Sequence, residues 1–289
     1  MIRRHMLQAA GMNTGIPRWN GRIRTAISVS GAIALLAVIM LGSRLMGSEG
    51  LAVSLEERNM APSPAHLFGT DWLGRDMLSR TVKGLALSIQ VGLLGAACST
   101  LIAAVMGLAA ATLGRAADRC ISWLIDVSLS VPHLVMLILI AFVCGGGMKG
   151  VAIGIMLTHW PSLARVVRAE ALQLMSADFV LVSRKLGRSR MWIASRHLAP
   201  HIGPQLLVGF LMLFPHAVLH EAAITFLGLG MSPHQPAIGI ILSESMRYLS
   251  TGMWWLAVFP GAGLLLAVWA FDRIGGHLRR LTDPGSVRL

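Results

Sequence analysis

The sequence predicts an all-α membrane protein with six transmembrane helices. Hydrophobic residues make up 55% of the 289 residues and charged residues only 13%, whereas roughly a quarter of the residues in a soluble domain are charged. The mean hydropathy is +0.67. The apolar residues gather in runs much longer than the roughly ten residues of a membrane-spanning strand. Only helices and closed barrels span a membrane, so these runs are predicted to be helices.

The apolar runs define the spans in chain order. Five are long and clear: Thr25–Met46, Ser88–Thr112, Ile121–Val143, Gly203–Leu229 and Trp254–Ile274. A sixth run covers Val151–Val167. It is weaker, because His159, Pro161 and Arg165 interrupt its end. About 20 apolar residues cross a hydrocarbon core of about 30 Å, and the first run is long enough to be a retained span rather than a cleavable signal.

Small residues are frequent in the second span, Gly92, Gly95 and Gly107 among them. In a membrane, small residues let helix backbones approach closely. We expect this span to pack tightly within the chain. A pore-lining or subunit-interface helix is the alternative.

Lysine and arginine are distributed unevenly between alternate loops. With the N-terminus inside, eighteen of the 25 cations lie in inside segments and seven outside, which follows the positive-inside rule. Both termini are therefore predicted to be cytoplasmic. The predicted boundaries are a cytoplasmic tail at 1–24, a first transmembrane helix at 25–46, an extracytoplasmic segment with an interfacial helix at 47–87, a five-helix transmembrane domain at 88–278 with a cytoplasmic loop at 161–202, and a cytoplasmic tail at 279–289.

Several function classes are disfavoured by the residues. The net charge of +12 sits between apolar spans rather than on a polar fold, so nucleic acid is not an expected partner. Lys83, Lys149 and Lys185 are the three lysines, and none stands in a Gly-Lys-Ser/Thr phosphate loop. The three cysteines lack metal-ligand spacing and are expected to act as small apolar residues. We expect neither an enzyme nor a cofactor.

The loop at 161–202 is the most informative segment. It carries seven lysine and arginine residues against Glu170 and Asp178. A cationic, partly helical loop on the cytoplasmic side suggests a docking surface for a soluble partner. The alternative is a helix that lies on anionic lipid, to which the same cations would be attracted.

Four segments carry a resemblance to a known family. In the loop, Leu181-Val182-Ser183 stands where the family has Glu-Ala-Ala, Gly187 is its glycine, and Pro200 is its proline at the expected spacing. The glutamate, isoleucine and leucine of that pattern are absent. Two further matches are GTDWLGRDMLSR at Gly69–Arg80 and FLGLG at Phe226–Gly230, and Asp283-Pro284 fits the C-terminal pattern. The chain resembles the membrane subunits of bacterial ABC importers, in the dipeptide, oligopeptide and nickel permease group.

The resemblance implies a type I ABC importer permease fold in the bacterial inner membrane. It also implies a second, homologous permease, two ATPase subunits and an extracytoplasmic solute-binding protein as partners, besides membrane lipid. A helix in the cytoplasmic loop would enter a cleft of the ATPase, and its expected contact and coupling residues are Phe179, Leu181, Ser183, Arg184, Leu186, Gly187 and Pro200. Gly187 would end that helix in the left-handed region.

The segment Gly69–Lys83 would lie outside the membrane. Thr70 or Asp71 is expected to cap a helix that begins at Trp72. We favour a scaffold that leads into the second span. A contact with the solute-binding protein is the alternative.

A histidine pair suggests a substrate. His216 and His220 share one face of the fifth span, and Glu221 lies beside them. Nickel permeases of the family show similar histidines, so we expect nickel or a metal chelate, with His216, His220 and Glu221 as transient ligands. Import of di- or oligopeptides is the alternative. Rivals of other classes are a stand-alone secondary transporter or channel and a non-transporting scaffold, and ionisable groups at the midplane are too sparse to favour the coupled transporter.

Overall fold

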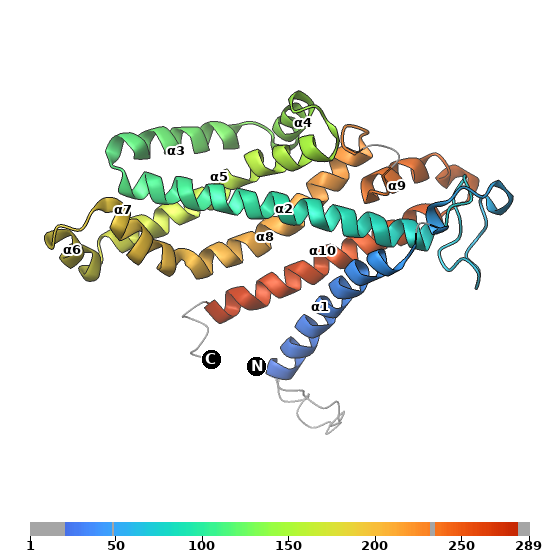
Figure 1. Ribbon diagram of the computed structural model, residues 1–289, viewed down its shortest axis with the longest axis horizontal. Helices are drawn as coiled ribbons and strands as arrows, with labels where there is room; N and C mark the ends of the chain where they lie inside the picture. The colour runs from blue at the N-terminus through green and yellow to red at the C-terminus, as the bar shows by residue number, and fades with distance from the viewer. Residues whose placement is uncertain (1–20, 48, 232–234, 283–289) are drawn as a thin grey trace, which may run out of the picture.

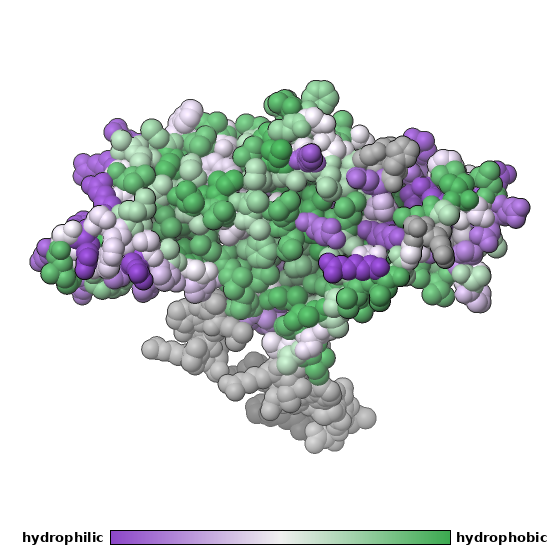
Figure 2. All heavy atoms as spheres, in the orientation of Figure 1, coloured by the Kyte–Doolittle hydropathy of each residue, from purple (hydrophilic) through white to green (hydrophobic). Residues whose placement is uncertain are grey.

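The computed structural model describes residues 21–47, 49–231 and 235–282. Its described part is mainly helical, and most of the long helices run roughly along the long axis of the molecule (Figure 1). Apolar side chains cover the middle of the face shown in Figure 2, and polar side chains gather toward its two ends. This banding is the surface that a membrane requires. The tail up to residue 20 and the Asp283-Pro284 pair lie outside the described residues.

Among the described residues, five helices are long and apolar enough to cross a membrane, or six if one bent pair counts as a single span. The uninterrupted ones are α1 (Gly21–Leu45), α2 (Met77–Thr112), α5 (Gly147–Met175), α8 (Ala199–Phe226) and α10 (Trp255–Thr282). Shorter elements are α6 (Asp178–Lys185), α7 (Arg190–Ile193), α9 (Ile238–Met246), the 3-10 turns η2 (Glu49–Leu51), η3 (Leu55–Glu57) and η5 (Leu249–Thr251), and the π-helical segment η4 (Ala194–Leu198) that joins α7 to α8.

The predicted third span is not one straight helix. It is divided into α3 (Arg115–Ser130) and α4 (His133–Val143), which meet at 99°. Pro132 causes the break, because it has no backbone N–H and its ring drives Val131 out of the helical region. Val131 accordingly has φ −87° and ψ 137°.

Two helix starts differ from the apolar pattern. The apolar run that begins at Ser88 belongs to a longer helix, because α2 starts at Met77, where the carboxylate of Asp76 accepts a hydrogen bond from Ser79 N at 2.8 Å. No helix begins at Trp72. The Asp71 carboxylate instead accepts hydrogen bonds from the backbone N–H groups of Leu73 and Arg75 and closes a turn.

The weak predicted span at 151–167 proves to be the middle of α5, which continues through Pro161 to Met175. Much of the predicted cytoplasmic loop is therefore helical. The segment between α8 and α10 contains α9, whose Ile238, Ile240 and Ile241 are buried.

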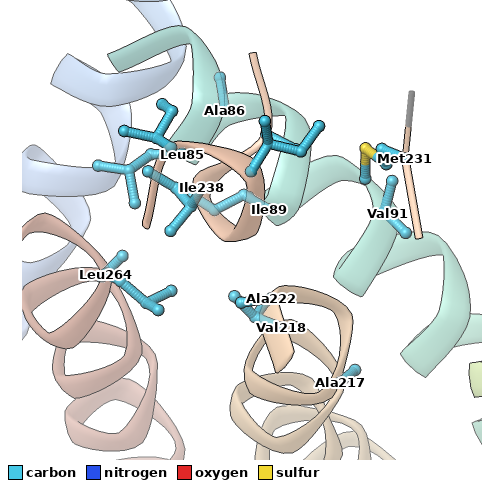
Figure 3. Close-up of a cluster of buried hydrophobic side chains, with 14 of the residues drawn as sticks. Leu85, Ala86, Ile89, Val91, Ala217, Val218, Ala222, Met231, Ile238 and Leu264 are labelled. Carbon is cyan, nitrogen blue, oxygen red and sulfur yellow. The ribbon is translucent and has the colours of Figure 1, made fainter. Parts of the chain in front are cut away.

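Helix α2 is the centre of the packing. A Cβ on Gly92 would lie 2.5 Å from a methyl of Val218 in α8, one on Gly95 would lie 2.5 Å from Ile155 in α5, and one on Gly107 would meet Val167 at 2.6 Å. These distances confirm the predicted tight packing within the chain. Figure 3 shows the resulting core, where Leu85 and Ile89 of α2 face Val218 and Ala222 of α8 and Ile238 of α9.

Candidate functional site

The end of the molecule that carries α6 and α7 holds the predicted coupling loop (Figure 1). Helix α6 ends at Gly187, whose φ of +77° lies in the left-handed region. Gly187 N–H donates to the Arg184 carbonyl and Arg188 N–H to the Ser183 carbonyl. This pair of bonds is a Schellman motif, so the predicted role of Gly187 as the helix stop is confirmed.

Helix α6 buries one residue and leaves its other apolar side chains open. Val180 is fully buried in a cluster with Ile193 and Leu198. Four of the predicted coupling residues or their neighbours are exposed: Phe179 by 39%, Leu181 by 40%, Val182 by 55% and Leu186 by 74%. Arg184 and Lys185 are exposed as well. The helix thus presents an apolar surface with cations at its C-terminal end.

Histidine rings from η4 and from the start of α8 pack against α6. Phe179 stacks on His201 with centroids 5.2 Å apart, and Ser183 Oγ lies 2.9 Å from His197 Nε2. Pro200 stands in the first turn of α8, directly after the π-helical segment η4. These contacts hold α6 in a defined orientation against the membrane helices.

Three of the seven cations in this loop bind oxygen atoms of neighbouring helices. Arg168 forms a two-pronged ion pair with Asp118 of α3, Arg165 contacts Asp126 at 2.6 Å, and Arg190 donates to the Leu113 carbonyl at 3.0 Å. They tie the loop to α3 and to the C-terminal end of α2. The cations on α6 itself remain at the surface.

The predicted metal residues do not come together. His216 is exposed and lines a groove of about 360 Å³ between α5 and α8. Glu221 is buried, and its carboxylate accepts a hydrogen bond from Thr225 at 2.8 Å. Adjacent helical residues point about 100° apart, so Glu221 cannot share the direction of His220.

Instead, His220 meets two histidines from other helices. His133 at the start of α4, His159 in α5 and His220 in α8 each offer a ligand atom within 4.8 Å of the others. Their ring centroids are 4.4 to 5.2 Å apart. Glycines allow this meeting, because a Cβ on Gly150 would lie 2.5 Å from the Ala141 carbonyl and keep α4 away from α5.

A buried ion network lies at the opposite end of the molecule. Arg80 of α2, only 3% exposed, donates to Asp71 at 2.6 Å and to Glu244 of α9 at 2.7 Å. Arg75 also reaches both carboxylates, at 2.7 and 3.3 Å. The matched segment Gly69–Arg80 therefore fastens the start of α2 to α9, which agrees with the scaffold role.

Comparison with known proteins places this chain. Residues 100–283 match the family model described as "Binding-protein-dependent transport system inner membrane component". The chain belongs to this family. It is thus a multi-pass permease component of an ABC importer, a class in which ATP is hydrolysed by separate ATPase subunits and substrate is delivered by a binding protein.

Relatives of the permease are named for peptides. It is 29% identical over 269 residues to the dipeptide transport system permease protein DppC of Bacillus subtilis, covering 92% of this chain and 84% of the relative. It is 34% identical over 257 residues to a putative peptide transport system permease of Brucella suis, covering 88% and 86%.

The fold of the permease is similar to that of a solved transporter. The inward-facing MetNI methionine ABC transporter structure matches with a TM-score of 0.51 and 19% identity, over 70% of this chain and 97% of that one. The similarity confirms the predicted ABC importer permease fold.

Sequence reasoning missed His133 and His159 as partners of His220. A usable signal existed for His133, a polar residue directly after Pro132 inside an otherwise apolar run. Ionisable residues within spans are costly and commonly functional. The pairing itself could not be read from the sequence, because it depends on how α4, α5 and α8 are rotated about their axes.

Proposed function

We propose that this permease is one of two homologous membrane subunits of an ATP-driven importer of di- and oligopeptides. The names of the relatives support peptides rather than nickel. The substrate expected from the histidine pair is corrected accordingly. The chain would supply half of the translocation pathway, beside a second permease, two ATPase subunits and an extracytoplasmic binding protein.

The observation that carries the coupling mechanism is the exposed apolar surface of α6. Val182 and Leu186 are 55% and 74% exposed on a helix that Gly187 ends sharply and that Val180 anchors. An apolar helix surface with cations beside it fits a groove on a soluble partner. We infer that the ATPase subunit receives this surface and that its motion is passed through Val180 and the rings of His197 and His201 to α8.

The proposed orientation places α6 and both termini in the cytoplasm. The eighteen-to-seven distribution of cations supports it. The ion network of Arg80 and the helix α9 then lie on the extracytoplasmic side, where the binding protein docks.

Uptake measurements test the substrate. A strain that lacks this chain should lose uptake of a radiolabelled dipeptide and regain it with the wild-type gene, whereas nickel uptake should not change. Loss of nickel uptake with normal peptide uptake would contradict the proposal. Peptide uptake that persists when the ATPase genes are deleted would favour a transporter that works alone.

A further inference from the structure

Two of the three histidines at the break between α3 and α4 have their rings fixed by backbone carbonyls of their own helices. His220 Nδ1 lies 2.7 Å from the His216 carbonyl, and His159 Nδ1 lies 3.0 Å from the Ile155 carbonyl. A carbonyl only accepts, so each Nδ1 carries the proton. Nε2 of both rings is therefore an unprotonated nitrogen with a lone pair.

This arrangement is the one found in metal-binding histidines. A ligating ring commonly donates its other N–H to a backbone carbonyl, which sets the tautomer and the ring direction. The third ring, His133, is held more loosely, since its Nε2 lies 3.5 Å from Thr158 Oγ1. It can turn to bring a nitrogen toward the other two.

One of these nitrogens is buried without a partner. His159 is 5% exposed, and its Nε2 has no hydrogen-bond partner among the residues that the structure describes. Burying an acceptor without a partner costs free energy. Such a group in a native structure calls for a ligand or another explanation.

The surrounding groups favour one class of ligand. The carboxylate nearest in sequence, Glu221, is bonded to Thr225 on another face of α8. A site of imidazoles without carboxylates suits zinc, nickel, cobalt or copper rather than calcium or magnesium, which prefer oxygen.

We propose that His133, His159 and His220 bind one divalent transition-metal ion. Metal–nitrogen bonds of about 2.0–2.1 Å place tetrahedral ligand atoms about 3.4 Å apart, so nitrogens now within 4.8 Å of one another converge by about 1 Å. His133 and His220 are only partly buried, which leaves a side where a further ligand completes the coordination. The bound ion links α4, α5 and α8 beside the break at Pro132.

Cobalt binding to the assembled transporter tests this site. The complex is purified with its partner subunits through a tag without histidine, and Co²⁺ is titrated while visible absorption is recorded. The wild-type complex should gain the bands of a nitrogen-ligated ion with one equivalent of Co²⁺, and its melting temperature should rise. His220→Ala should weaken this binding at least tenfold and remove the rise.

His216→Ala is the matched control, because it removes an exposed histidine one turn away on the same helix and leaves its backbone carbonyl in place. It should bind Co²⁺ as the wild type does. Equal binding by the wild type, H216A and H220A would overturn the proposal, and so would loss in H216A alone or the absence of imidazole bands in the wild type.

Assembly is checked separately. Co-purification of the subunits shows that each variant folds, and His133→Ala, at the loosely held ring, replaces His220→Ala if that variant fails to assemble. The binding assay contains no peptide, so it is independent of the proposed peptide transport. Failure of peptide uptake with intact metal binding would contradict only the proposed function.

Discussion

The two ends of this permease are built by different means. At the end that carries α6, the key helix is stopped by a local Schellman motif at Gly187 and leaves Val182 and Leu186 exposed. At the other end, Arg80 is 3% exposed and joins Asp71 to Glu244, residues far apart in the chain. The first construction leaves a surface free for a partner, whereas the second closes the molecule on itself. Helix α6 is therefore the proposed docking element, whereas the network of Asp71, Arg80 and Glu244 forms a fixed frame.

The glycines of the two ends show the same contrast. Gly74 has φ +75°, and a Cβ there would lie 1.7 Å from the Ser54 carbonyl oxygen. Gly187 has φ +77°, and a Cβ there would meet nothing within 4 Å. The two φ angles are nearly equal, but only Gly74 is surrounded by packed atoms.

Removing the buried cation Arg80 should cause the largest loss of folding stability. Arg80→Ala removes this cation and leaves Asp71 with Arg75 as its remaining ion partner, so the loss should approach the cost of breaking a buried pair, about 3–5 kcal/mol. We expect little folded protein in membranes, measured by fluorescence-detected size exclusion and melting temperature. Arg58→Ala, at an exposed site in the same segment, is the control. Equal stability of the two variants would show that the network does not hold the frame.

The two glycines allow a matched pair of variants. A non-glycine residue in the left-handed region costs about 1–2 kcal/mol. Gly187→Ala should lower the free energy of unfolding by this amount only. Gly74→Ala should lose clearly more, because its methyl also overlaps backbone atoms of Ser54. Thermal unfolding in detergent compares them. A larger loss of stability in G187A than in G74A would show that the end carrying α6 is the more tightly packed one.

An exposed ion pair at the end that carries α6 should contribute little to stability. Arg165 and Asp126 are 56% and 69% exposed in the pair at 2.6 Å, and such pairs contribute about 0–1 kcal/mol. Arg165→Ala should therefore change the melting temperature only slightly, and less at high salt. A loss of stability as large as that of Arg80→Ala would mean that solvent does not screen the Arg165–Asp126 ion pair.

The smallest effect on stability should accompany a large effect on transport. Val182→Asp changes an exposed side chain, so the free energy of unfolding should stay within about 0.5 kcal/mol. Peptide uptake and co-purification of the ATPase subunits should both fall, because a charge enters the proposed apolar contact. Leu113→Asp is the control, since Leu113 is 54% exposed at the same end but outside α6. Normal uptake by V182D would exclude α6 as the docking surface.

The sequence by itself determined the features that depend on composition and on neighbouring residues. The apolar runs predicted the membrane helices, and Gly187 was predicted as the end of α6, because a helix stop depends on a few adjacent residues. The break at Pro132 has a local cause as well, although the length of the apolar run concealed it. The cation distribution predicts an orientation that the proposed experiments address.

The tertiary structure alone decided which distant side chains meet. His220 was predicted to act with His216 and Glu221 of its own helix, but it lies against His133 and His159. Likewise, Asp71 does not cap a helix at Trp72 but pairs with Arg75 and Arg80. Such contacts depend on the rotation and close approach of separate helices, which Gly92, Gly95 and Gly150 permit through packing. A local pattern carries no information on those rotations, because its hydrogen bonds and side-chain contacts extend only about four residues along a helix.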